Sequence, residues 1–359
     1  MKKVKHGGNV YEIAEAYGFK EEEIVDFSAN INPLGLPKSF KKALVENIHV
    51  VEKYPDPEYK SLVQTIAEAN HVAPENIIVG NGATEIIFSI ISALRAKRCL
   101  LTAPTFLEYE RALTKAGCDV VFYYLKEKND FQVDDGIFGA LEDVDLLILC
   151  NPNNPTGKLV DRERLKEILR LCAEKRIHLI VDEAFIDFVD EPQQDTLRQY
   201  IDEYKNIYII RALTKFFALP GLRIGYGISS NTVLLEKVRN EKEPWTVNSY
   251  AALAGEILLK DEAYIQESRS WILKERCYLY DALGKISGIK VFKPEANYIL
   301  IKMEKEGIHL HKELLMRKIL IRQCGNYENL NQQFYRVAIK DRESNEKLIQ
   351  AMKEVFYEA

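Results

Sequence analysis

Between about residues 75 and 230, short apolar runs alternate with segments of helical length. The runs read NIIVG, RCLLTA, DVVFYY, VDLLILC, IHLIVD, NIYIIR and RIGYGIS. Segments between them, such as ATEIIFSIISALRA and DRERLKEILRLCAEK, carry apolar residues at i, i+3 and i+4 spacing. This alternation predicts βαβ units. We therefore expect an α/β fold whose mostly parallel seven-stranded sheet is covered by helices on both faces.

The two ends of the chain have a different pattern from this central part. Helical patterns at about 246–260 and 262–286 precede short strand patterns and a helix that begins near residue 342. We expect a large domain over residues 46–249. We expect residues 1–45 and 250–359 to form a smaller α+β domain with an N-terminal arm, since 359 residues suffice for two domains.

Composition excludes several classes of protein. A net charge of −5 and a pI near 5.9 argue against a nucleic-acid partner or an anionic membrane surface, and no apolar run is long enough to span a membrane. The six cysteines form no C-x-x-C pair, and the first residues lack the apolar core of a secretory signal. Both observations favour a cytoplasmic protein with reduced thiols. The pair His309 and His311 has no third ligand, so we expect no metal site.

Polar residues follow several of the predicted strands, at the edge where an open α/β sheet binds ligands. Gly82, Ala83 and Thr84 begin a helix, whose free N–H groups favour a phosphate, although a simple helix cap is the alternative. Asn154, in NPNNPTG, is a candidate donor to a ligand oxygen, and its bond to Pro155 is cis or trans.

Two charged residues at strand ends need a partner. Asp182 closes the run IHLIVD, where a carboxylate is costly unless it meets a cation or several donors. Lys215 lies in RALTKFFALPGLRIGY, beside Thr214 and eight residues before Arg223. Burial lowers the pKa of a lysine and makes its amine a usable nucleophile. The alternative is a surface lysine whose stem covers apolar neighbours.

These features match the needs of one cofactor, pyridoxal 5′-phosphate. It requires a lysine for its imine, an acid that keeps its ring nitrogen protonated, a polar partner for its phenolic oxygen and a cradle for its phosphate. The strand ends supply all four in the expected chain order. We therefore interpret Lys215 as the lysine that carries the cofactor.

Motifs along the whole chain carry a family resemblance: HGGN, DFSANINPLG, DEAFIDF, LTKF, PGLRIGY, ILIR and YRVAIK. With them the chain resembles fold-type I pyridoxal-phosphate enzymes, in the group that contains histidinol-phosphate aminotransferase and L-threonine-O-3-phosphate decarboxylase. The match is closest to the decarboxylase. The resemblance implies decarboxylation of L-threonine O-3-phosphate to (R)-1-amino-2-propanol O-2-phosphate and carbon dioxide, a reaction of cobalamin biosynthesis.

The resemblance also implies roles for individual residues. The catalytic residues are Lys215, which would hold the cofactor, and Asp182, which would face its ring nitrogen. Asn154 would bond the phenolic oxygen, and Phe106 would stack on the ring. The residues that would bind the cofactor phosphate are Gly82, Ala83, Thr84, Thr214 and Arg223. Tyr54 would reach the phosphate in a neighbouring subunit, which implies a homodimer. For the substrate they are Arg336 on the carboxylate, with His6, Gly7, Asn30, Asn154 and Arg322 around the phosphorylated end.

Two positions depart from the aminotransferases of this group. Position 185 is Phe where these aminotransferases usually have Tyr, and the decarboxylase pattern also has Phe there. Position 212 is Ala in place of the usual Ser or Thr. The HGGN stretch at residues 6–9 has the glycines of an anion-binding nest, with a flexible arm as the alternative.

Three questions stay open from the residues alone. Histidinol-phosphate aminotransferase is the alternative function, and L-serine O-phosphate is an alternative substrate. A sensor protein that binds the cofactor without turnover is a third alternative, although no basic helix-turn-helix pattern is present.

Overall fold

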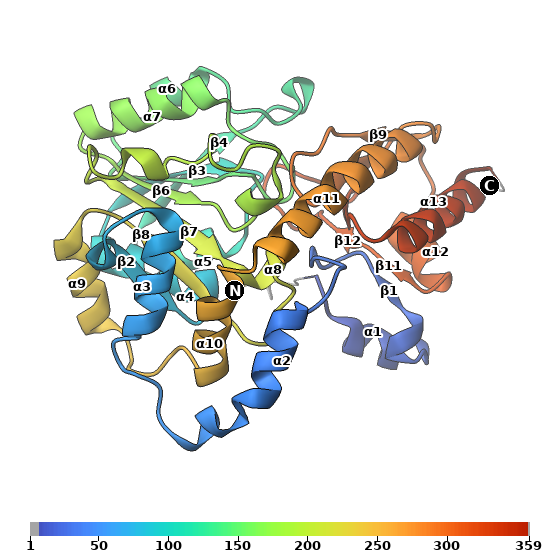
Figure 1. Ribbon diagram of the computed structural model, residues 1–359. Coiled ribbons are helices and arrows are strands. Elements are labelled where there is room, and N and C mark those ends of the chain that lie inside the picture. The colour runs from blue at the N-terminus through green and yellow to red at the C-terminus, as the bar shows by residue number, and fades with distance from the viewer. Residues whose placement is uncertain (1–6, 358–359) are drawn as a thin grey trace.

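A seven-stranded sheet is the largest element of the computed structural model, which describes residues 7–357 (Figure 1). The strands are β2 (Ile77–Gly80), β3 (Arg98–Ala103), β4 (Asp119–Tyr124), β5 (Leu146–Cys150), β6 (His178–Asp182), β7 (Ile207–Ala212) and β8 (Gly225–Ile228). Their order is β2-β8-β7-β6-β5-β3-β4, and only β8 runs antiparallel to its neighbours. All seven predicted runs form strands, and the mostly parallel sheet is confirmed.

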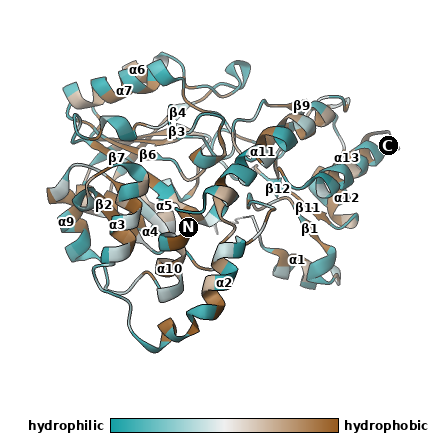
Figure 2. Ribbon diagram, viewed as in Figure 1, coloured by the Kyte–Doolittle hydropathy of each residue, from teal (hydrophilic) through white to brown (hydrophobic). Residues whose placement is uncertain are grey.

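Helices cover both faces of this sheet because successive strand residues point to opposite sides. On one face lie α4 (Gly82–Leu94), α5 (Glu108–Lys115) and α9 (Thr232–Glu241), packed against Ile148 and Ile180. On the other face lie α3 (Lys60–Asn70), α7 (Arg162–Glu174) and α10 (Ser249–Leu258), packed with Leu149 and Val181. Figure 2 shows both hydrophilic and hydrophobic residues along α3, α7 and α9.

A second, antiparallel sheet has the strand order β12-β13-β10-β9. Its strands are β9 (Ile289–Val291), β10 (Tyr298–Met303), β12 (Arg322–Gln323) and β13 (Phe334–Ala338). Beside it, β1 (Val25–Asp26) pairs in parallel with β11 (Ile319–Leu320), which joins the start of the chain to its end. Around this part of the molecule lie α1 (Val10–Tyr17), α11 (Glu262–Leu283), α12 (Leu310–Met316) and α13 (Arg342–Tyr357) (Figure 1).

The remaining described helices are short or connect these parts. They are α2 (Lys38–Glu46), α6 (Gly136–Ala140) and α8 (Leu213–Phe216), with a 3₁₀ turn η2 (Ile48–Glu52). The expected helices near residues 246–260, 262–286 and 342 onward are present as α10, α11 and α13. The domain boundaries at residues 45 and 250 stay a prediction. Within residues 7–357, no helix is long and apolar enough to cross a membrane.

Candidate active site

One pocket lies where the carboxyl ends of the large sheet meet the second sheet and the chain between β1 and α2. It encloses about 240 Å³. The predicted site residues that line it are Gly7, Asn30, Ala83, Thr84, Phe106, Asn154, Asp182, Thr214, Lys215, Arg223, Arg322 and Arg336. His6 lies outside the described residues. Gly82 is not part of the lining, and Tyr54 is an exposed side chain that contacts the ring of Trp245.

Lys215 follows strand β7, in the single turn of α8, and its half-buried side chain opens onto the pocket. Burial, together with the positive charges of Arg336 and Arg223, lowers the pKa of Lys215 to about 8. The surface-lysine alternative is therefore wrong. An amine with this pKa is partly neutral near pH 7, as a nucleophile or proton carrier requires.

Asp182 ends strand β6 at the floor of the pocket, and it is buried. Its Oδ2 accepts from the hydroxyl of Tyr109 at 2.7 Å, and its Oδ1 accepts from the backbone N–H of Ala184 at 2.9 Å. Among the described residues it has no ion-pair partner, and burial raises its pKa. The site thus holds a carboxylate that a cation in the pocket would stabilise.

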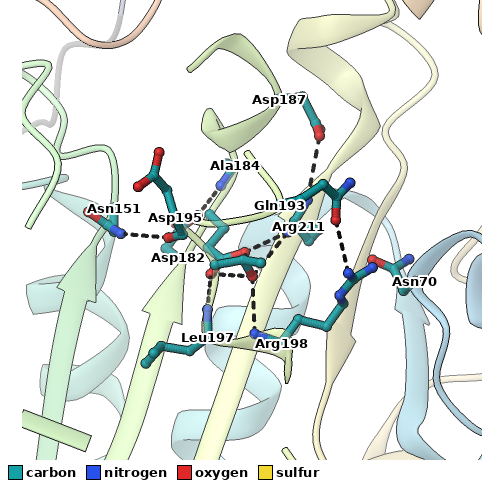
Figure 3. A network of polar contacts seen from close by, with 12 residues as sticks. Asn70, Asn151, Asp182, Ala184, Asp187, Gln193, Asp195, Leu197, Arg198 and Arg211 are labelled. Atoms are coloured by element: carbon teal, nitrogen blue, oxygen red, sulfur yellow. Dashed lines mark hydrogen bonds and ion pairs between the residues drawn. The ribbon is translucent and has the colours of Figure 1, made fainter. Parts of the chain in front are cut away.

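Glu183, the next residue, is not part of the pocket lining and bonds to Arg211, which Figure 3 draws together with Asp182. Its carboxylate accepts from Nε of Arg211 at 2.8 Å and from the hydroxyl of Thr196 at 2.8 and 2.9 Å. Consecutive strand residues point to opposite faces, so one acid reaches the pocket and the other forms a buried ion pair. Burial raises the pKa of Glu183, while Arg211 opposes that effect.

The start of α4 forms one end of the pocket. Gly82 has φ +79, and a Cβ added there would lie 2.6 Å from Nη2 of Arg223. The guanidinium therefore packs directly over the helix N-terminus, where only glycine leaves room. Asn81, the capping position, makes no side-chain capping bond, so backbone N–H groups at this end are available to an anion together with Arg223 and Thr84.

Two arginines face the opposite end of the pocket. Arg322 and Arg336 are directly paired across β12 and β13, which places both side chains on the same face of the sheet. Both are buried, and neither has an ion-pair partner among the described residues. Arg322 donates to Oδ1 of Asn326 at 2.9 Å. Arg336 therefore forms no surface ion pair within residues 7–357.

Arg336 and Asn154 are bound to each other. Nη1 of Arg336 donates to Oδ1 of Asn154 at 2.5 Å, and Nη2 donates to the carbonyl of Ser28 at 2.7 Å. Because that oxygen of Asn154 is occupied, its amide nitrogen is the group left to donate to a ligand. The Asn154–Pro155 bond is cis. Within residues 7–357, the buried atoms Nε of Arg336 and Oδ1 of Asn30 have no hydrogen-bond partner.

The two departures also lie at the pocket. Phe185 is buried, with its ring edge-on to Tyr298 at 5.0 Å between centroids. Ala212 lines the pocket beside Thr214, whose hydroxyl donates to the carbonyl of Ile224 at 3.4 Å. Neither departure adds a polar group to the wall.

Three pocket or support residues were not expected from the sequence. Ser28 and Tyr327 line the pocket, and Tyr109 holds Asp182. Tyr109 follows the predicted ring-stacking Phe106 by three residues, which is the spacing of neighbours on a helix, although α5 begins only at Glu108. That spacing could have predicted it. Ser28 and Tyr327 lie in irregular segments, where the pattern gives no signal.

The pocket fits pyridoxal phosphate. Asp182 offers an uncompensated buried carboxylate to a protonated ring nitrogen, and the glycine-tight contact of Arg223 with α4 offers an anion cradle. Lys215 lies between them and the two arginines. Among the described residues, no group of three His, Cys, Asp or Glu side chains is placed to hold a metal ion. Fold and pocket together define a fold-type I pyridoxal-phosphate enzyme.

Comparison with known proteins agrees. The family model described as aminotransferase class I and II matches residues 22–352. Threonine-phosphate decarboxylase of Salmonella typhimurium is 42% identical over 98% of this chain and 96% of its own length. The adenosylcobalamin biosynthesis bifunctional protein of Leptospira interrogans is 35% identical over 98% of this chain and 41% of its own length.

A solved structure described as histidinol-phosphate aminotransferase from Clostridium acetobutylicum is 41% identical, with a TM-score of 0.88, and the match covers 93% of this chain and 99% of that one. The chain therefore belongs to the class I and II aminotransferase family. It is a pyridoxal-phosphate-dependent enzyme.

Proposed function

We propose that this protein decarboxylates L-threonine O-3-phosphate, giving (R)-1-amino-2-propanol O-2-phosphate and carbon dioxide, as a step of cobalamin biosynthesis. The observation that carries the proposal is the pair of buried arginines, Arg322 and Arg336, which open onto the same pocket as Lys215. A small substrate with a carboxylate and a phosphate near its amine matches this set of charges. Similarity to a threonine-phosphate decarboxylase over nearly the whole chain supports it.

The substrate's two anionic groups would be held separately. Arg336 would bind the carboxylate, and its unpartnered Nε and the charge assistance make such a contact worth about 1.5–3 kcal/mol. Arg322, Asn30 and backbone N–H groups near Gly7 would bind the phosphate, together with His6. Arg336 and the phosphate-binding groups would fix the substrate at two points. The orientation that they impose would decide which bond at Cα breaks.

The cofactor would be held by the opposite wall. Asp182 would pair with its ring nitrogen, Asn154 would donate to its phenolic oxygen, and Phe106 would cover its ring. The phosphate would bind at the start of α4, to Gly82, Ala83, Thr84, Thr214 and Arg223. When bound, pyridoxal phosphate supplies an electron sink for the bond that breaks at Cα.

Lys215 would attach the cofactor and then act on protons. With a pKa of about 8, it can release a proton to Cα after carbon dioxide has left and regain it from water near neutral pH. No amino acceptor is required. Asp182, held by Tyr109 and the N–H of Ala184, keeps its position throughout.

Histidinol-phosphate aminotransferase is the second candidate, supported by the description of one similar solved structure. Phe185 favours the decarboxylase. Two assays on the cofactor-loaded protein decide between them: carbon dioxide release from L-threonine O-3-phosphate without a keto acid, and glutamate formation from histidinol phosphate and 2-oxoglutarate. We expect the first to be catalytic and the second negligible. Efficient transamination without carbon dioxide release would refute the decarboxylase. L-Serine O-phosphate in the first assay tests the alternative substrate.

We also propose that the protein is a cytoplasmic homodimer. Exposed apolar side chains gather along the end of α2, η2 and the segment after it; they are Val45, Ile48, Val51 and Tyr54, with Trp245 against Tyr54. A second copy covering this surface would bury them and bring Tyr54 to the neighbouring site. Sedimentation measures the dimer directly. The six cysteines are free, which supports a reducing compartment.

A further inference from the structure

Ser28 lies where three parts of the pocket meet, and the proposed reaction gives it no role so far. It follows strand β1 by two residues, it is 2% exposed, and it lines the pocket. It lies in the DFSANINPLG motif, but no feature of the sequence assigns it a role of its own. Its importance is visible only in its contacts.

The contacts of Ser28 run in three directions. Its backbone N–H and its hydroxyl both donate to Oδ1 of Asp26, at 2.7 and 2.6 Å. Its Oγ accepts from the backbone N–H of Gly8 at 2.7 Å. Its carbonyl accepts from Nη2 of Arg336 at 2.7 Å. One buried residue therefore joins the start of the chain, an acid of β1 and a pocket arginine.

The fit between Ser28 and the start of the chain is close. A Cβ added at Gly7 would lie 2.2 Å from the carbonyl oxygen of Ser28. Gly8 has φ +83, a conformation that residues with a side chain rarely adopt. Both glycines are therefore required for the chain to cross directly over Ser28, beside the pocket that Gly7 lines.

Asp26 fixes the direction of the Ser28 hydroxyl. A hydroxyl has one hydrogen and two acceptor lone pairs, so donation to Asp26 turns a lone pair toward the N–H of Gly8. Without Asp26 the hydroxyl would be free to rotate, and the bond to Gly8 would weaken. The contact with Arg336 uses the main chain and does not depend on the hydroxyl.

We propose that Ser28 is a positioning residue, which holds residues 7–8 and Arg336 in one arrangement around a doubly anionic substrate. Ser28 does not touch the reacting atoms. The substrate's identity in this inference rests on the proposed function, but the contacts of Ser28 do not.

The first test is Ser28→Ala, which removes Oγ and keeps the carbonyl that binds Arg336. Amide hydrogen exchange of the holoenzyme, read at residues 7–9 by mass spectrometry, should be about 2- to 10-fold faster, as expected for the loss of one hydrogen bond. Ser39→Ala is the matched control, because Ser39 is an exposed residue whose hydroxyl donates to Asp261. It should leave exchange at residues 7–9 unchanged.

The second readout separates positioning from a merely structural role. L-Threonine O-3-phosphate should slow exchange at residues 7–9 in the wild type and in Ser39→Ala, and less in Ser28→Ala. The KM of Ser28→Ala for this substrate should rise more than its kcat falls. Asp26→Asn keeps the hydroxyl and an acceptor, so its effects should be smaller in the same direction. If Ser28→Ala fails to fold, Asp26→Asn is the variant used for both measurements.

Two outcomes would overturn the inference. One is exchange in Ser28→Ala equal to that in Ser39→Ala. The other is faster exchange with an unchanged KM, which would leave Ser28 with a structural role only. If the wild type releases no carbon dioxide, the proposed function fails, while the exchange comparison without substrate still decides whether Ser28 holds residues 7–8.

Discussion

The pocket has two walls that the chain builds in different ways. The wall that we propose for the cofactor comes from one edge of the large sheet. Asn154, Asp182, Lys215 and the start of α4 follow the carboxyl ends of parallel strands, and Arg223 precedes the antiparallel strand β8. The substrate wall comes from separate segments; it consists of Gly7, Ser28, Asn30, Arg322 and Arg336. A single buried sheet fixes the first wall, whereas the second depends on how the second sheet and residues 7–30 pack against it.

This difference implies a division of labour. Residues of the cofactor wall are held by strands whose backbone is paired on both sides, so substitutions there should change chemistry with little displacement of neighbours. Residues of the substrate wall are held by side-chain contacts, as Arg336 is by Ser28 of its own wall and by Asn154 of the other. Substitutions there should change binding and reaction specificity.

The largest effect should follow loss of the lysine on the cofactor wall. Lys215→Ala removes both the attachment point of the cofactor and the proton carrier, so kcat for carbon dioxide release should fall roughly 10³-fold or more. Borohydride reduction followed by peptide mass spectrometry should find the cofactor on Lys215 in the wild type and nowhere in the variant. Lys60→Ala, at an exposed lysine paired with Glu58, is the control and should be fully active.

Asp182, the last residue of β6, and Glu183, which follows it, test whether one acid serves the reaction while the other stabilises the fold. Asp182→Asn removes the negative charge that we propose pairs with the ring nitrogen, and kcat should fall roughly 10²-fold with little change in Tm. Glu183→Gln removes the closer of the two charge partners of Arg211 and leaves only Asp187 at 3.4 Å, which should cost up to about 3–5 kcal/mol of unfolding free energy. Thermal denaturation and steady-state kinetics on both variants measure how much stability and how much kcat each substitution removes. Equal effects on Tm would contradict this separation of roles.

The difference between the two walls also explains which site residues could be predicted from the sequence. Asp182 and Lys215 follow apolar runs that form strands, so their position at the sheet edge follows from the alternation of elements. Arg322 and Arg336 meet only because β12 pairs with β13 in one register, and short irregular strands do not specify that register in the sequence. Their roles came from the resemblance alone. Ser28 acts through two main-chain and two side-chain contacts with distant or irregular segments, which no pattern in the sequence predicts.

On the substrate wall, Arg336→Lys should have the next largest effect. Lysine keeps the charge but cannot make the two-pronged contact to a carboxylate, and it loses the bond to Asn154 or to Ser28. We expect kcat/KM for L-threonine O-3-phosphate to fall roughly 10- to 100-fold. Cofactor affinity, measured by fluorescence titration, should change much less. A loss of cofactor affinity as large as the loss of kcat/KM would show that the walls are not separable.

The pKa of Lys215 predicts how cofactor attachment depends on pH. With a pKa of about 8, roughly a tenth of the amine is neutral at pH 7, against fewer than about one in 1,000 for an ordinary lysine. The rate of attachment to the apoprotein, followed by absorbance, should rise about tenfold per pH unit below pH 8 and level off above it. In Arg336→Lys the plateau should stay near pH 8, since burial is the main cause of the lowered pKa. A rate that still rises steeply at pH 10 would contradict a lowered pKa.

The smallest effect concerns Phe185, at the boundary of the two walls. Phe185→Tyr adds a hydroxyl to a buried ring that contacts Tyr298, and that hydroxyl would reach the phenolic oxygen of the cofactor. One added hydrogen bond should tighten cofactor binding about 2- to 10-fold. It should not convert the decarboxylase into an aminotransferase, because the substrate wall, which selects the bond that breaks, is unchanged. Parallel carbon dioxide and glutamate assays test this, with Phe138→Tyr on α6 as the control. Substantial glutamate formation by Phe185→Tyr would place reaction specificity on the cofactor wall and reverse the division drawn between the two.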